Sequence, residues 1–131
     1  MKTGSIPSAD QWLREAKADA AAADCGMFLL HNGVVRRSAK ARVRAGDEQA
    51  PDVRGMRFSY DREKTAAAVA QAEAMEGIRI VRVWMNEGEL RVGDDILYVL
   101  VGGDIRPHVV DALQALVGRL KSECVTELEL S

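Results

Sequence analysis

The chain has 131 residues, of which 47% are hydrophobic and 29% charged, and its formal net charge is −2. This size and composition predict one globular domain over residues 1–131 and leave too little chain for two. The slight negative charge argues against nucleic acid as a partner, and no apolar run approaches the roughly 20 residues that cross a bilayer.

The N-terminal part predicts a helix followed by a buried strand. Ser8 and Gln11 have the spacing of a capping box and open an alanine-rich helix that we expect to run to about Asp24. Residues 1–26, which include this helix, lack the apolar core of a signal peptide, so we expect a cytoplasmic protein with no membrane partner. The apolar run from Gly26 to Asn32 is typical of a strand.

A cationic segment follows, with five Lys or Arg residues between Arg36 and Arg44. It leads into a stretch rich in Gly, Pro and Asp that indicates a loop. Two interpretations are open. The segment is either a solvated hairpin or an arm that faces an anion with only some of its five charges.

The pattern is more regular beyond residue 55. We expect strands at 56–60, 78–85 and 95–101, a turn at 86–94, and a helix that Asp61 caps and Gly77 ends. Pro107 favours a helix start and opens a helix to about Glu123, after which an alternating strand closes the chain. This order predicts an α+β fold in which helices pack on one face of a mainly antiparallel sheet.

Local signatures of the common enzyme classes are absent from the sequence. No Ser stands in a GxSxG turn, and no lysine follows the Val-Gly-Gly-Asp stretch as a Walker motif requires. Cys25 and Cys124 form no CxxC, and we expect both to be small buried residues. We therefore predict no metal site and no cofactor.

Three cations stand at the ends of predicted elements. Arg36 follows the first strand, and Arg106 precedes a helix N-terminus, where free N–H groups and the helix dipole favour an anion. Lys121 lies near the end of that same helix, roughly 20 Å from its start at 1.5 Å per residue. Lys121 and Arg106 can therefore share a site only if a neighbouring subunit or a long arm brings them together.

Two blocks of the sequence resemble the large, catalytic subunit of molybdopterin synthase. The block GMFLLHNGVVRR is similar to that family's apolar run followed by Gly-x-Val-Arg. Residues 78–121 resemble its Gly-x-Leu-x-x-Gly-(Asp/Glu) turn, β run, Ser-x-His-Arg stretch and amphipathic helix ending in Leu-Lys. Residues 56–74 stand in place of the family's Leu-Glu-x-Tyr strand and the helix after it.

The resemblance implies an α/β hammerhead fold and a homodimer at the centre of a heterotetramer. A ubiquitin-like small subunit would deliver sulfur from its thiocarboxylated Gly-Gly tail to a pterin phosphate, cyclic pyranopterin monophosphate. Arg36 matches the arginine of Gly-x-Val-Arg and Arg106 the arginine of His-Arg, both expected to bind the phosphate or the tail carboxylate. Lys121 matches the lysine of Leu-Lys, which is catalytic in that family.

The chain departs from the family at positions that bear on this site. Ile105 stands where the family has histidine, Leu128 replaces its second lysine, and Glu127 adds a carboxylate beside it. Ser59 and Asp61 replace the Glu and Tyr of Leu-Glu-x-Tyr. At roughly 1.5–3 kcal/mol for each charged contact, we expect phosphate affinity to fall about a hundredfold or more. The alternative prediction is therefore a catalytically inactive paralogue that serves as a dimeric binding or assembly module.

Overall fold

The computed structural model describes residues 6–131. Residues 1–5, which open the stretch without a signal-peptide core, lie outside the described residues. In chain order the elements are α1 (Ala9–Ala18), a 3₁₀ turn (Ala20–Asp24), β1 (Met27–Val34), α2 (Lys40–Ala45), β2 (Gly55–Tyr60), α3 (Arg62–Glu73), β3 (Ile78–Met85), β4 (Gly88–Arg91), β5 (Asp95–Gly103), α4 (Arg106–Arg119), a π-helical turn (Leu120–Cys124) and β6 (Val125–Leu130). The six strands of the described residues form two three-stranded antiparallel sheets, in the orders β1-β5-β3 and β4-β2-β6.

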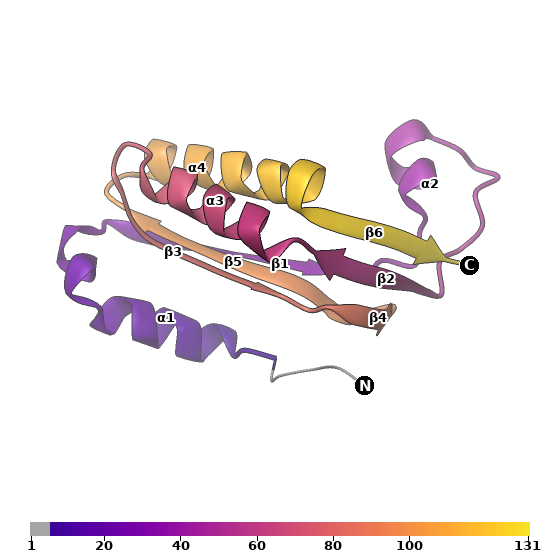
Figure 1. Cartoon of the computed structure of the whole chain (residues 1–131), viewed down its shortest axis with the longest axis horizontal. Coiled ribbons are helices and arrows are strands. Elements are labelled where there is room, and N and C mark those ends of the chain that lie inside the picture. Colours follow the sequence, from indigo (N-terminus) through magenta and orange to yellow (C-terminus); the bar gives the residue numbers. More distant parts are fainter. Residues whose placement is uncertain (1–5) are drawn as a thin grey trace.

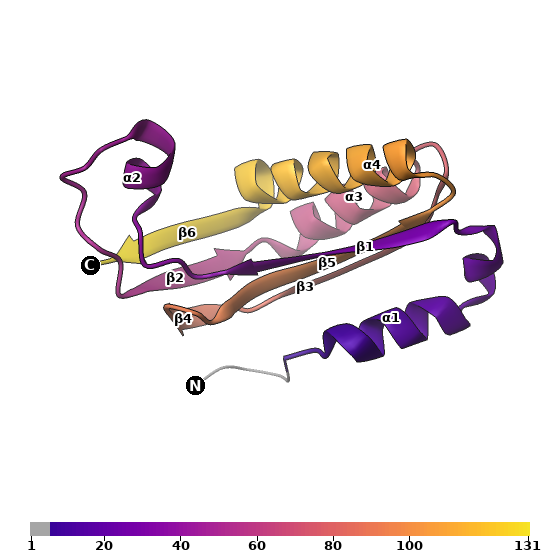
Figure 2. The same ribbon diagram turned by 180° about the vertical axis from the view of Figure 1, so that it is seen from behind.

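The layers place helices on both faces of the first sheet. Helices α3 and α4 lie side by side over one face, and α1 covers the other (Figures 1 and 2). The expected α+β class with a mainly antiparallel sheet is confirmed. The expectation that helices cover one face holds for α3 and α4, and the N-terminal helix adds a third layer. No helix of residues 6–131 is long and apolar enough to span a membrane.

Strand β5 is the centre of the molecule, as its near-continuous apolar run predicts. Leu97, Val99 and Val101 are fully buried and belong to the core beneath α3 and α4. Tyr98 and Leu100 point the opposite way and pack against α1, where the Trp12 and Tyr98 rings meet edge to face at 5.8 Å. Because both faces are covered, the strand carries no alternation of polar and apolar residues.

The N-terminal helix is shorter than predicted. Ser8 caps α1 by accepting a hydrogen bond from the Gln11 N–H at 3.3 Å, which confirms the predicted start. The continuous helix to Asp24 was wrong, because Asp19 adopts an extended conformation and ends α1. The Asp19 carboxylate accepts a hydrogen bond from the Ala21 N–H at 2.8 Å and so starts a separate turn.

The hairpin interpretation of the cationic segment was also wrong, because residues 40–45 form the short helix α2. Gly46 ends it with a left-handed backbone, φ 71°, which glycine adopts without strain. A small buried cluster of Ala39, Ala50 and Val53 holds the segment together. In Figure 1, α2 lies beyond the end of α4, next to β6.

The predicted turn at 86–94 contains the short strand β4. It pairs with β2 from Gly55↔Arg91 to Phe58↔Gly88. Gly55 permits this approach, since a Cβ there would collide with the Leu90 carbonyl. A four-residue strand flanked by glycines is too short to be distinguished from a turn by its sequence pattern.

Candidate functional site

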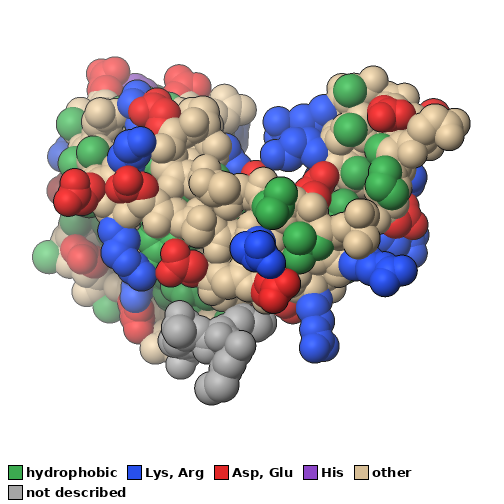
Figure 3. Space-filling view, turned by 45° about the vertical axis from the view of Figure 1, so that its right-hand side comes forward, with side chains coloured by type: hydrophobic (Ala, Val, Ile, Leu, Met, Phe, Trp, Pro, Cys, Tyr) green, Lys and Arg blue, Asp and Glu red, His purple; other side chains and the backbone are tan. Residues whose placement is uncertain are grey.

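A groove of about 670 Å³ lies where the end of β1, helix α2, the end of α4 and strand β6 meet. Four cations line it, namely Arg36, Lys40, Arg44 and Lys121. Figure 3 shows the surface hollowed between the helical layer and the lobe that carries α2, with Lys and Arg side chains beside the hollow. The groove therefore collects positive charge in a chain whose net charge is negative.

Lys121 reaches the groove from the π-helical turn that follows α4. Leu120 and Cys124 of this turn are buried at 0% and 4% exposure and anchor it on the core. Lys121 follows Leu120 directly and keeps 34% of its side chain exposed. The wider turn thus seals the core with two apolar side chains and leaves the lysine at the groove surface.

Glu127 enters the same groove from β6. The side chains of this strand alternate, so Glu127 and Glu129 are partly buried while Thr126 and Leu128 are exposed. The Glu127 carboxylate accepts hydrogen bonds from Lys121 Nζ at 2.7 Å and from Lys40 Nζ at 3.2 Å. Burial raises the pKa of Glu127, but the hydrogen bonds and charges of the two lysines outweigh it, and the net pKa lies below its ordinary value. The carboxylate is therefore ionised at neutral pH.

Helix α2 supplies two of the four cations. Lys40 and Arg44 are four residues apart, so they lie on one face of the helix and both reach the groove. Arg42 is directed elsewhere and pairs with Asp52 at 3.0 Å. The segment is thus an arm of which only some charges face the groove.

Arg36 lies just beyond β1, where its side chain lines the groove. Its Nε donates a hydrogen bond to the Ser38 carbonyl at 2.9 Å, which orients the guanidinium. With Glu127 and Glu129 as the two carboxylates of the groove and its adjoining recess, cations outnumber carboxylates four to two. This excess suits a bound anion.

His31 of β1 also lines the groove and is half-buried. Burial, and next the charge of Lys121, lower the pKa of His31. The ring is therefore neutral at pH 7, with one nitrogen able to donate a hydrogen bond and the other able to accept one. The sequence predictions do not include His31, because no spacing in the sequence links it to Lys121.

The structure brings Arg36 and Lys121 together and leaves Arg106 apart. Arg106 is the first residue of α4, exposed, at the end of the helix opposite to the groove (Figure 1). Fourteen residues of helix separate it from Lys121 by about 20 Å. The positions where the family has histidine and its second lysine, Ile105 and Leu128, are 52% and 51% exposed and do not line the groove.

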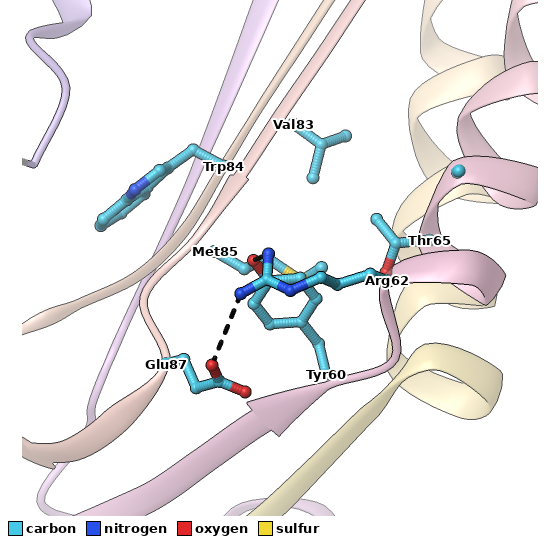
Figure 4. Close-up of a pocket in the computed structure, with 8 residues that line it drawn as sticks. Tyr60, Arg62, Thr65, Val83, Trp84, Met85 and Glu87 are labelled. Atoms are coloured by element: carbon cyan, nitrogen blue, oxygen red, sulfur yellow. Dashed lines mark hydrogen bonds and ion pairs between the residues drawn. The ribbon is translucent and has the colours of Figure 1, made fainter. Parts of the chain in front are cut away.

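A second concavity of about 510 Å³ lies between the start of α3 and the end of β3 (Figure 4). Its one cation, Arg62, is 3.7 Å from a Glu87 oxygen and donates a hydrogen bond to the Tyr60 hydroxyl at 2.6 Å. The Arg62 guanidinium also lies 4.9 Å from the centre of the Tyr60 ring. Since the concavity has one cation beside one carboxylate and the groove has four cations, we place the candidate site in the groove beside Lys121.

The fold and the groove together define an α+β protein in which arginine and lysine side chains converge beside the last helix. A family model described as the MoaE protein matches residues 8–123, so the chain belongs to the MoaE family. The resemblance inferred from the sequence is thereby confirmed. The role that goes with this family is that of a large subunit in molybdenum cofactor biosynthesis.

Solved structures agree with this assignment of the fold. Molybdopterin synthase from Staphylococcus aureus has a TM-score of 0.71 and 15% identity, over 95% of this chain and 85% of that one. The molybdopterin biosynthesis MoaE protein from Burkholderia ambifaria has a TM-score of 0.70 and 16% identity, over 96% and 84%. A complex of subunits 1 and 2 of the molybdopterin-converting factor from Helicobacter pylori contains a chain with a TM-score of 0.66 and 13% identity, over 94% and 78%. A search of curated proteins found no significant match.

Proposed function

We propose that this chain is the large subunit of a molybdopterin synthase. Its groove would support the transfer of sulfur from the thiocarboxylated tail of a small ubiquitin-like subunit to cyclic pyranopterin monophosphate. The observation that carries this proposal is the convergence of Arg36 and Lys121, which are far apart in the sequence and line one cationic groove. Family membership over residues 8–123 supports it.

Each groove residue has a role that its chemistry allows. Arg36 presents a planar set of N–H donors that suits a phosphate or a carboxylate. Lys121 assists acyl and sulfur transfer, because its ammonium group stabilises negative charge that develops on the reacting atoms. The anionic substrates are drawn to this face by the excess of cations.

The proposal includes two protein partners. The Helicobacter pylori neighbour is a complex of two subunits, which supports a small subunit as the partner of this chain. A second copy of the chain is the other partner. Arg106 would bind substrate in a site that the second copy helps to build, because within one chain it lies at the far end of α4.

The alternative of an inactive dimeric module is not favoured. It rests on the replacement of a histidine by Ile105 and of a lysine by Leu128. The groove nevertheless keeps Arg36 and Lys121 and gains Lys40 and Arg44 from α2. The chain therefore retains enough positive charge beside Lys121 to bind anionic substrates.

Reconstitution tests the proposal. Purified protein, a thiocarboxylated small subunit and cyclic pyranopterin monophosphate are expected to yield molybdopterin, measured as its fluorescent oxidation product. Lys121→Ala should lower the rate by about 10²–10³, the range for the loss of one group that stabilises transition-state charge. Lys17→Ala, an exposed lysine of α1 on the other face of the sheet, is the matched control and should leave the rate unchanged.

Two results would contradict the proposal. One is the absence of product from the unaltered chain with a small subunit that binds it. The other is a rate for Lys121→Ala equal to that of Lys17→Ala.

A further inference from the structure

We propose that Lys40 and Lys121 form one oxyanion site and that the Glu127 carboxylate is its resident counter-ion, which competes with the incoming anion. The inference rests on the proposed function for the identity of that anion. It adds a substrate-binding residue, Lys40, that the resemblance does not supply.

The geometry around Glu127 describes the site. One carboxylate oxygen lies 2.7 Å from Lys121 Nζ, and the other lies 3.2 Å from Lys40 Nζ. A single carboxylate thus bridges two ammonium groups from segments far apart in the sequence, namely α2 and the turn after α4. A phosphate or a terminal carboxylate has the same oxygen chemistry and can make the same two charge-assisted contacts.

The two lysines remain accessible from the groove, while their counter-ion is mostly covered. The side chains of Lys40 and Lys121 are 46% and 34% exposed, and that of Glu127 is 9% exposed. Each ammonium group has three N–H donors, of which Glu127 occupies one. An anion that enters from solvent therefore meets the remaining donors of both lysines. It competes with the Glu127 carboxylate for the positive charge of the lysine pair.

Lys40 supplies a cation to the groove, whereas Leu128, which stands where the family has its second lysine, does not line it. Leu128 neighbours Glu127 on β6 and is therefore directed to the opposite face of the strand, away from the groove. The Lys40 backbone N–H donates a hydrogen bond to the Glu129 carboxylate at 3.0 Å, which fixes the start of α2 on β6. This contact places the Lys40 side chain over Glu127, and Arg44 follows one turn later.

Titration of the isolated full-length chain tests the site without a small subunit or a pterin. The probes are inorganic phosphate and N-acetyl-Gly-Gly, followed by backbone amide chemical shifts in ¹⁵N-labelled protein. Lys40→Ala should weaken binding of the preferred probe about tenfold, and Lys40→Arg should restore most of it. Lys17→Ala is the control and should bind as the unaltered chain does.

Glu127→Gln should change probe binding in the opposite direction to Lys40→Ala, and it keeps the size of the side chain. Loss of the competing charge should strengthen binding about tenfold, whereas a residue with only a structural role would yield no gain. This variant tests the inference even where Lys40→Ala loosens α2. Stronger binding of phosphate assigns the lysine pair to the substrate phosphate, and stronger binding of the peptide assigns it to the tail carboxylate.

Three outcomes would overturn the inference: neither probe binds, Lys40→Ala binds as Lys17→Ala does, or Glu127→Gln binds no more strongly than the unaltered chain. Failure of the proposed function is a separate result. It would show as anion binding with this pattern in a chain that produces no molybdopterin.

Discussion

Glu127 illustrates how burial and pairing oppose each other at a single residue. Removing a carboxylate from water favours its neutral form, while an ammonium group within hydrogen-bond distance favours the charged form. With Lys121 and Lys40 both in contact, the pKa of Glu127 is lowered despite burial. Substitution of either lysine leaves a mostly buried charge with less compensation, so these variants need a stability measurement beside the activity measurement.

A second group of charged residues lies at the other end of α4. The Asp104 carboxylate is 2.8 Å from His108 Nδ1, and a Glu76 oxygen is 3.4 Å from His108 Nε2. Gly77 follows Glu76 in the chain with a φ of 78°, and a Cβ on it would collide with the Asp104 and His108 side chains. The hydrogen bond to Asp104 is the largest cause that raises the pKa of His108.

This histidine makes stability depend on pH in a defined direction. Because its pKa is raised in the folded state, its contribution is complete below the ordinary value of 6.5 and is lost as pH rises through the raised value. We expect the Tm advantage of the unaltered chain over His108→Gln to shrink as pH rises above about 6.5. Thermal unfolding of both proteins at several pH values measures this difference in Tm.

His31 provides a control of opposite sign. Its pKa is lowered by burial, so its contribution is present above the ordinary value and is lost as pH falls. The advantage over His31→Gln should therefore shrink toward acid. A pH-independent difference between the unaltered chain and His108→Gln would show that Asp104 and His108 are not coupled in the folded protein.

The sequence predicts the start of α3 correctly. Asp61 precedes it and accepts a hydrogen bond from the Lys64 N–H at 2.9 Å, as an N-cap does. The predicted end at Gly77 was wrong, because α3 ends at Glu73 with Ala74 as its C-cap. Ala68 and Ala72 are buried on the core side of the helix, at 2% and 3% exposure. The small alanine side chains let α3 approach α4 and the sheet closely.

Removal of the cap should cost stability. We expect Asp61→Ala to lower the free energy of unfolding by about 1 kcal/mol, because one N–H at the start of α3 loses its partner. Urea denaturation followed by circular dichroism measures this value. Glu73→Ala, an exposed position at the end of α3, should change it by less than about 0.5 kcal/mol. Equal effects of the two substitutions would contradict the capping role.

Helix α2 was missed because its six residues have no internal reason to be helical. Its N-cap residue, Ala39, has no side chain that can accept a hydrogen bond from the first turn, and helices this short are unstable in isolation. Its stability comes from outside, through the Glu129 carboxylate on the Lys40 N–H and the buried cluster of Ala39, Ala50 and Val53. Contacts between segments that are about 90 residues apart cannot be predicted from a local sequence pattern.

The whole molecule combines a rigid centre with an arm that few contacts hold. Strand β5 is hydrogen-bonded to β1 and β3 on its two sides and covered by helices on both faces. The arm from Arg36 to Arg54 contacts the rest of the chain chiefly through β6. Within the arm, the small cluster of Ala39, Ala50 and Val53 is its only buried apolar cluster among the described residues. Local opening is therefore expected in the arm and not in β5.

Hydrogen exchange followed by mass spectrometry can measure this contrast. We expect amides of residues 97–101 to exchange only on global unfolding, whereas those of residues 40–45 exchange faster by at least two orders of magnitude. Phosphate at a saturating concentration should slow exchange in residues 40–45, since Lys40 and Arg44 face the groove, and leave residues 97–101 unchanged. Protection of α2 equal to that of β5 in the free protein would contradict a loosely held arm.

The sequence by itself determined the family, the α+β class, the central strand and most helix starts, and it predicted Arg36 and Lys121 as site residues. These features depend on local patterns, on caps and on motif order, which are written along the chain. Only the tertiary structure decided that Arg106 lies apart from them within one chain and that Lys40, Arg44, His31 and Glu127 complete the groove. The physical reason is that a binding groove collects side chains by their distance in space, and the alternation of β6 and the docking of α2 set those distances.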